Sequence, residues 1–282
     1  MTPLRLAGLG DNVVDRYVDQ GVLYPGGNAV NVAVHARRSG ADTAFVGVLG
    51  TDAAGDLVEL SLLSEGVRLE RVRRVQGDTA FATVYTDESG DRSFGLCHKG
   101  VSLFLPNQRD LDYLAEFDIV HLCETIRLEA KLPAISSCAA VSYDFSGRDN
   151  VYAAPLLRWV TFAIFSRPES SREEAVAQIA WAHSRGARWV VVTRGARGAA
   201  ISDGMRVHLQ EAAPAEVVDT LGAGDSFIAR LLVRLWEGAG LAEAAAEAAC
   251  YSAQVCCCLG GFGHGRSLAG SNVQAGPRQT HE

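Results

Sequence analysis

The chain has 282 residues, enough for one large α/β domain or two small ones. Apolar residues make up 48% and charged residues 21%, and no apolar run is long enough to span a membrane. The formal charge of −7 argues against broad nucleic-acid binding, although a local site for a small anion stays compatible with it.

The N-terminus and the cysteines point to a cytoplasmic protein. Residues 1–15 lack the basic region, the long apolar segment and the cleavage site of a signal peptide. The seven cysteines are an odd number for a disulfide framework. Cys256, Cys257 and Cys258 are adjacent, and neighbours on a helix point about 100° apart, so they cannot easily share a metal. We interpret them as small buried side chains in a reducing compartment.

The first quarter of the chain predicts strands and helices in alternation. A buried strand at residues 4–9 ends in the loop Gly10-Asp11-Asn12, and residues 17–24 form either a short strand or an excursion. The next predicted elements are a helix that stops at Gly40, a strand and a second helix, at residues 26–40, 43–50 and 54–65.

Between residues 67 and 104 the pattern changes. The segments "FATVYTD" and "RSFGLCH" flank the turn "ESGD", which predicts antiparallel strands. We expect a small β-sheet lid formed from about residues 13–25 and 67–104.

From Phe117 the alternation of strand and helix returns. Strands are predicted at 119–122, 141–145, 162–165 and 189–193, and helices at 128–139, 171–185, 223–237 and 241–259. This alternation favours an α/β fold with a central, mainly parallel sheet flanked by helices. Residues 260–282 are rich in Gly, Ser, Asn and Gln, so we expect one domain over 1–265 and a flexible tail over 266–282.

The stretch "VVDTLGAGDSFIARLLVRL", residues 217–235, carries the most specific chemistry. "VVDT" is predicted to end a strand, and a helix follows the glycines at 222 and 224, which let the backbone approach a ligand. The first amides of a helix attract an anion, which Asp225 would repel unless it handles a proton there. Phosphoryl transfer needs both parts, and an aspartate of ordinary pKa, about 3.9, is ionised at neutral pH. The alternative is a tight turn with a helix-start carboxylate favoured by the dipole.

Two distant segments together resemble one family. "DTLGAGDSF" resembles the D-T-x-G-A-G-D signature of the ribokinase-like (phosphofructokinase B) carbohydrate kinases, and residues 26–58 resemble the N-terminal signature of that family. The resemblance covers residues 4–265 and implies a ribokinase-like fold, ATP, Mg²⁺ and a small-molecule sugar substrate. "LGDNVVD", "GGNAVNVAV", "FDIVH" and "DFS" resemble the branch that phosphorylates fructosamines such as fructoselysine, at C6.

The resemblance implies roles at the signature loop. Asp225 would be the catalytic base, and Gly222, Ala223 and Gly224 would supply amides for the anion hole. Asp219 would organise the loop on the nucleotide side, with a monovalent cation such as K⁺ in some relatives.

It also implies the sugar site. Asp15 would accept two hydroxyls, and Gly27 and Asn31 match the sugar contacts of the family. Two of these assignments have an alternative. Asn28 contacts the sugar or is a helix N-cap, and Asp11 helps to bind the sugar or caps a turn.

Three further residues are assigned with an alternative or a departure from the family pattern. Glu124 is a substrate-facing carboxylate or a solvent-facing loop residue. Lys99 would suit a carboxylate on the substrate, or is an exposed loop lysine. Glu169 matches the glutamate of the N-x-x-E metal motif, but Ser166 replaces the asparagine, which leaves the details of magnesium binding open.

The nucleotide site is implied by "VVVTRGARGAAIS". Thr193, Gly195 and Gly198 would border the phosphates and ribose of ATP, and Arg194 would pair with a phosphate or face water.

Other functions are weighed against the fructosamine kinase. A kinase of a simple sugar or nucleoside stays open, as does a catalytically inactive sugar sensor, although an intact Asp225 loop argues against the sensor. A dinucleotide-binding oxidoreductase is not supported, because no G-x-G-x-x-G begins a helix near Gly8. The exposed edges of the lid strands suggest a homodimer through the lid.

Overall fold

The computed structural model describes residues 2–86 and 92–268. Most of the expected tail, residues 269–282, lies outside this part of the chain.

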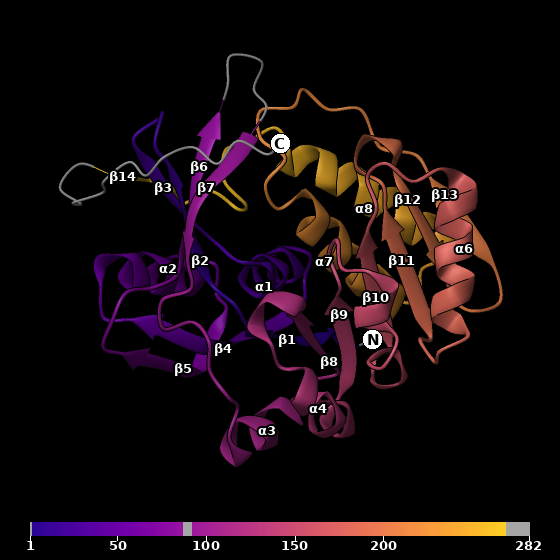
Figure 1. Cartoon of the computed structure of the whole chain (residues 1–282), viewed down its shortest axis with the longest axis horizontal. Helices are drawn as coiled ribbons and strands as arrows, with labels where there is room; N and C mark the ends of the chain where they lie inside the picture. Colours follow the sequence, from indigo (N-terminus) through magenta and orange to yellow (C-terminus); the bar gives the residue numbers. More distant parts are fainter. Residues whose placement is uncertain (1, 87–91, 269–282) are drawn as a thin grey trace.

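A large sheet crosses the molecule (Figure 1) and, within the described residues, has nine strands. All of its neighbouring strands run parallel except at one edge, where β12 and β13 are antiparallel. In spatial order the strands are β13 (Val207–Gln210), β12 (Ala199–Ser202), β11 (Trp189–Thr193), β10 (Phe162–Ser166), β9 (Ala140–Asp144), β8 (Ile119–Cys123), β1 (Arg5–Gly10), β4 (Asp42–Gly50) and β5 (Arg68–Val75).

Helices cover both faces of this sheet, as the alternating pattern predicts. One face packs against α1 (Asn28–Arg38), α2 (Ala53–Ser64), α7 (Ala223–Trp236) and α8 (Leu241–Val255). The other face packs against α3 (Gln108–Leu114), α4 (Leu132–Cys138), α5 (Asn150–Ala153) and α6 (Arg172–His183). Short 3-10 turns are η1 (Glu124–Ile126), η2 (Glu129–Lys131), η3 (Leu157–Trp159) and η4 (Gly195–Arg197).

The central strands read as apolar runs because both of their faces are buried. Along β1, for example, Leu6, Ala7 and Leu9 are fully buried although they alternate between the two sides of the sheet. Leu6 packs with α1 and α7 residues, whereas Ala7 and Leu9 pack in the cluster on the opposite face.

A second sheet, which has five strands within the part of the chain that the structure describes, lies beside α1 and α2, at the upper left of Figure 1. Its order is β14 (Arg266–Ser267), β3 (Val22–Gly26), β2 (Val13–Tyr17), β6 (Phe81–Thr86) and β7 (Arg92–His98). The antiparallel pair predicted from "FATVYTD" and "RSFGLCH" is β6 and β7.

The boundaries of this small sheet differ from the expected ones. Residues 68–75 form β5, which pairs parallel to β4 in the large sheet, because α2 returns the chain in a β–α–β unit. In turn, Arg266 and Ser267, expected in the tail, pair with β3 as β14.

The expected strand before the signature helix is wrong. The segment from Glu211 to Gly222 is irregular, and Val217 and Val218 are 62% and 53% exposed, so they do not belong to a buried strand. Among the helices that the structure describes, none is long and apolar enough to cross a membrane.

Candidate active site

The candidate residues gather where the central strands end. Asp11 follows β1, Glu124 follows β8, and Asp144 is the last residue of β9. The helices α1 and α7 begin at the same edge and bring Asn28, Asn31 and Asp225 to it. In a doubly wound sheet, ligands bind at this carboxyl edge, where the strand order reverses; here β1 lies between β4 and β8.

Asp11 caps helix α1. Its carboxylate accepts hydrogen bonds from the backbone N–H groups of Asn28 and Ala29, at 3.1 and 3.0 Å. The N-cap position itself is Gly27, with φ 108°, and a Cβ there would lie 2.7 Å from the Asn12 Cα. Asn28 is therefore the first residue of the helix and not its cap, so its side chain is available to the site.

Two asparagines hold the carboxylate of Asp225. Asn28 Nδ2 donates to one oxygen at 2.8 Å, and Asn31 Nδ2 donates to the other at 2.7 Å. Asn28 Nδ2 also donates to Asp144 Oδ2, at 2.9 Å. The structure thus joins three residues of the predicted site and adds Asp144 to them.

Burial, which has the largest effect, and the charges of Asp144 and Asp11 together raise the pKa of Asp225 to about 7, against the hydrogen bonds from Asn31 and Asn28, which lower it. Burial likewise raises the pKa of Asp144 to about 6. The expectation of an ordinary aspartate pKa is therefore wrong. A carboxylate that titrates near neutral pH is well matched to accept a proton and release it again.

Asp144, His121 and Ser142 are site residues to which sequence reasoning gave no role. His121 Nε2 lies 2.8 Å from Asn28 Oδ1, and His121 Nδ1 lies 2.9 Å from Ser142 Oγ. The available signal was a set of polar residues within apolar strands, in "FDIVH" and "SYDFS".

The expected sugar-binding residues at the small sheet occupy different environments. Asp15, on β2, is buried, and a Cβ on Gly26 of the adjacent strand would lie 2.6 Å from its Oδ2. Lys99 is exposed at the end of β7, and the charges of Lys99 and Asp15 act in opposite directions on the pKa of Cys97. Lys99 and Asp15 are thus both close enough to Cys97 to influence the pKa of its thiol.

Glu124 is part of an ion pair. Its carboxylate accepts two hydrogen bonds from the guanidinium of Arg148, at 3.0 and 2.8 Å, with the Glu124 side chain 14% exposed. Glu124 is therefore not a solvent-facing loop residue, and its contact with the substrate stays a prediction.

Asp219 organises the loop before α7. Its buried carboxylate accepts hydrogen bonds from Tyr17 Oη at 2.6 Å, Leu221 N at 2.8 Å and Gly260 N at 2.9 Å. These bonds tie the small sheet, the signature loop and the segment after α8 to one carboxylate.

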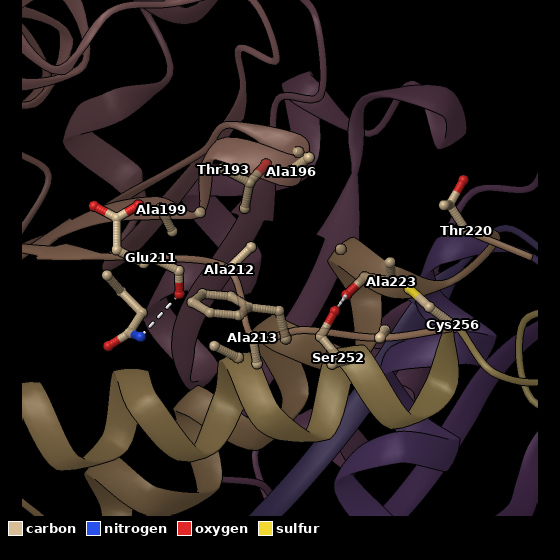
Figure 2. A pocket seen from close by; sticks show the side chains of 18 of the residues that line it. Thr193, Ala196, Ala199, Glu211, Ala212, Ala213, Thr220, Ala223, Ser252 and Cys256 are labelled. Carbon is tan, nitrogen blue, oxygen red and sulfur yellow. Dashed lines mark hydrogen bonds between the residues drawn. The ribbon is translucent and has the colours of Figure 1, made fainter. Parts of the chain in front are cut away.

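A cavity of about 640 Å³ lies between the sheet edge and helix α8 (Figure 2). Thr193, Gly195 and Gly198 line one side, while Ala223 and Gly224 at the start of α7 line another. Most of the remaining lining residues are small, and they include Ala196, Ala199, Ala212, Ala213, Ala249, Ser252 and Ala253. This volume lies in the range of sites for small molecules and cofactors.

Arg194 does not face water, and its pairing with a phosphate stays a prediction. Its side chain is buried, and its Nε donates to the carbonyl of Ser170 at 3.1 Å. This bond links the residue that follows β11 to the turn before α6.

Glu169 is exposed and paired with Arg197, at 2.9 Å, whereas Ser166 lines the cavity. Within residues 2–86 and 92–268, no group of three or more His, Cys, Asp or Glu side chains is arranged to hold a metal ion. A Mg²⁺ ion held mainly by substrate phosphates and water does not need such a group.

A family model described as "pfkB family carbohydrate kinase" matches residues 4–163 and 161–264 of the chain. The protein belongs to this family. It is a phosphotransferase that acts on a sugar hydroxyl.

Characterised relatives resemble this carbohydrate kinase over most of its length. It is 39% identical over 267 residues to the fructosamine kinase FrlD of Bacillus subtilis, covering 93% of this chain and 94% of the relative. It is 35% identical over 248 residues to the fructoselysine 6-kinase of Escherichia coli, with 86% and 93% covered.

Solved structures confirm the ribokinase-like fold of this carbohydrate kinase. Arabidopsis thaliana ribokinase in complex with ribose and ATP matches with a TM-score of 0.79, 23% identity, and 93% and 95% of the two chains covered. Xylella fastidiosa fructokinase with bound ATP matches with a TM-score of 0.75, 20% identity, and 92% and 94% covered.

Proposed function

We propose that this carbohydrate kinase transfers the γ-phosphate of ATP to the C6 hydroxyl of a fructosamine such as fructoselysine. The observation that carries the proposal is the place of Asp225. It is held by two asparagines at the start of α7, directly beside the small-residue cavity. The relatives named fructosamine kinase and fructoselysine 6-kinase support the substrate.

Asp225 acts as the base in this proposal. Asn28 and Asn31 fix the carboxylate in position, and one of its oxygens accepts the proton of the attacking hydroxyl. The N–H groups of Gly222 and Gly224 at the start of α7 face charge that develops on the transferred group, as helix N-termini do, whereas the N–H of Ala223 donates to the carbonyl of Thr220 at 3.2 Å.

The chain's residues fit ATP and Mg²⁺. The cavity has the volume and the small side chains that a nucleotide needs, and its wall includes the positive end of α7. Mg²⁺ spreads the charge of the phosphates when it is bound. Ser166 borders the cavity, whereas the carboxylate of Glu169 is exposed and paired with Arg197.

Lys99 and Asp15 suggest where the sugar and its amino-acid part lie. Asp15 accepts hydroxyl groups of the sugar, and the exposed ammonium of Lys99 favours a carboxylate on the conjugate. We therefore propose a fructosyl amino acid with a free carboxylate near Lys99.

The test is ATP- and Mg²⁺-dependent ADP release across a panel of fructoselysine, other fructosyl amino acids, free fructose, ribose and adenosine. Turnover confined to the fructosyl conjugates is the expected result, and position-specific NMR of the product would place the phosphate at C6. Turnover with a simple sugar alone would reject the conjugate, and binding without ADP release would indicate a sugar sensor.

The small sheet supports a proposal about assembly. β7 is its edge strand, so its outer backbone groups can pair with a second copy of the chain. Light scattering of the purified protein distinguishes the homodimer that we propose from a monomer.

A further inference from the structure

The side chain of Asn28 is held from both ends. Its amide nitrogen uses both protons, one for Asp225 at 2.8 Å and one for Asp144 at 2.9 Å. Its oxygen lies 2.8 Å from His121 Nε2. Because an amide oxygen can only accept, His121 Nε2 must carry the hydrogen of this bond.

His121 is in turn fixed by its own neighbour. Its ring is fully buried on β8, and Ser142 Oγ on β9 lies 2.9 Å from Nδ1. With the hydrogen on Nε2, Nδ1 is an acceptor and the hydroxyl of Ser142 donates to it. Burial lowers the pKa of His121 to about 3, so the ring is neutral at working pH and exchanges no proton with the site.

We infer that His121 and Ser142 are positioning residues that orient Asn28, and through it the base Asp225. The N–H of His121 can bond only to the oxygen of the Asn28 amide. This bond therefore favours the amide orientation in which the oxygen faces His121 and both amide protons face the carboxylates. This inference rests on the proposed role of Asp225.

Loss of this orientation should lower the rate of the reaction, because small displacements of reacting groups lower catalysis strongly. Loss of this orientation should also change how the activity depends on pH. The hydrogen bond from Asn28 lowers the pKa of Asp225, while the charges of Asp144 and Asp11 raise it. An Asn28 that swings away gives up the first effect and leaves the other two, so the pKa of Asp225 rises.

Three variants of His121 test the inference. His121→Gln keeps an N–H near the place of Nε2, His121→Asn keeps only a group near Nδ1, and His121→Phe keeps ring volume without a donor. The matched control is His183→Phe, because His183 also lies near a serine hydroxyl, Ser202 Oγ at 2.9 Å, but on α6 and away from Asn28.

For His121→Phe and His121→Asn we expect kcat to fall roughly tenfold to hundredfold, with the sugar KM little changed. The acidic limb of kcat/KM should move to higher pH in both. His121→Gln should recover most of kcat and the wild-type limb, and His183→Phe should change neither. If His121→Phe does not fold, the comparison of Gln with Asn decides alone.

Equal kcat and equal pH profiles for the Gln and Asn variants would overturn the inference, because the donor to Asn28 would then be irrelevant. Asp225→Asn separates this from the proposed function. Normal turnover in that variant would reject Asp225 as the base. If Asp225→Asn loses turnover while the His121 variants behave like the wild type, only the positioning role is rejected.

Discussion

Beside Asp225, the side chain of Asn31 has a polar atom that makes no hydrogen bond within the described residues. Asn31 is buried and donates to Asp225, but its Oδ1 finds no hydrogen-bond partner among the described residues. If Asp225 becomes an asparagine, rotation of the Asn31 amide by half a turn offers this oxygen to the new N–H. The substitution therefore removes the carboxylate and keeps a hydrogen bond between residue 225 and Asn31.

We expect Asp225→Asn to lower kcat roughly hundredfold or more, because an amide cannot accept the proton. ATP affinity and the melting temperature should stay close to wild type, since the hydrogen bonds can be re-formed. Coupled ADP release, nucleotide titration and thermal unfolding measure the three effects. A variant with near-normal kcat would contradict the role of Asp225.

The pKa of Asp225 predicts how activity depends on pH. Its folded-state value is raised to about 7, and the base must be ionised, so kcat/KM should fall as pH drops through this value. Asp144→Asn removes a negative charge that raises this pKa, so the acidic limb should move to lower pH.

The control for this shift is Asp118→Asn. Asp118 is bonded to Arg5 at the opposite end of the strands, so its loss should leave the limb in place. A limb that does not move in Asp144→Asn would show that Asp144 does not act on the titrating group.

The residues nearest the chemistry could be predicted because they lie in short contiguous motifs. Asp225, Asn28 and Asn31 all stand in such motifs, and the structure brings them together. The raised pKa of Asp225 could not be predicted, since it depends on burial and on Asp144, which is distant in the chain. Likewise, nothing local to Glu124 indicates its pairing with Arg148.

At the scale of elements, the start of α7 contains two glycines with different reasons to be there. Gly222 has φ 75°, and a Cβ on it would lie 2.7 Å from the carbonyl oxygen of Gly261. Gly224 has a helical backbone, and a Cβ on it would meet nothing within 4 Å. The first glycine serves the fold and the second leaves space in the cavity.

These two sites give a matched pair of substitutions. Gly222→Ala should destabilise the protein by about 1–3 kcal/mol, from strain and overlap. Gly224→Ala should leave the melting temperature equal or slightly higher, because alanine favours a helix, while it weakens ATP binding. Thermal unfolding and nucleotide titration of both variants are the measurements, and normal ATP affinity in Gly224→Ala would contradict the phosphate site at this turn.

Elements with a strong periodicity were predicted well, and elements defined by a distant partner were not. The β10 and β11 strands and helix α7 follow from local apolar patterns, within a few residues. β5 is rich in arginine and belongs to the large sheet only because it pairs with β4. β14 has two residues, and its strand character comes wholly from β3.

Over the whole molecule, the contact of Tyr17 with Asp219 connects the two ligand sites that we propose. Tyr17 lies two residues after Asp15 on β2, and Asp219 lies on the loop that leads to Asp225. We expect Tyr17→Phe to leave the fold intact and to raise KM for both sugar and ATP several-fold. Tyr113→Phe, which removes a hydroxyl bonded to Glu70 at 2.8 Å beside α3, is the control and should change neither KM.

The same contact also means that the two substrates share a free energy of coupling. If binding the sugar stabilises β2 against the loop, and the loop must be ordered to bind ATP, each substrate tightens the other. Thermodynamics requires the two factors to be equal, so the gain in ATP affinity with sugar present must match the gain in sugar affinity with a non-hydrolysable ATP analogue present. In Tyr17→Phe both factors should approach one together, and calorimetric titrations in either order would then give additive free energies.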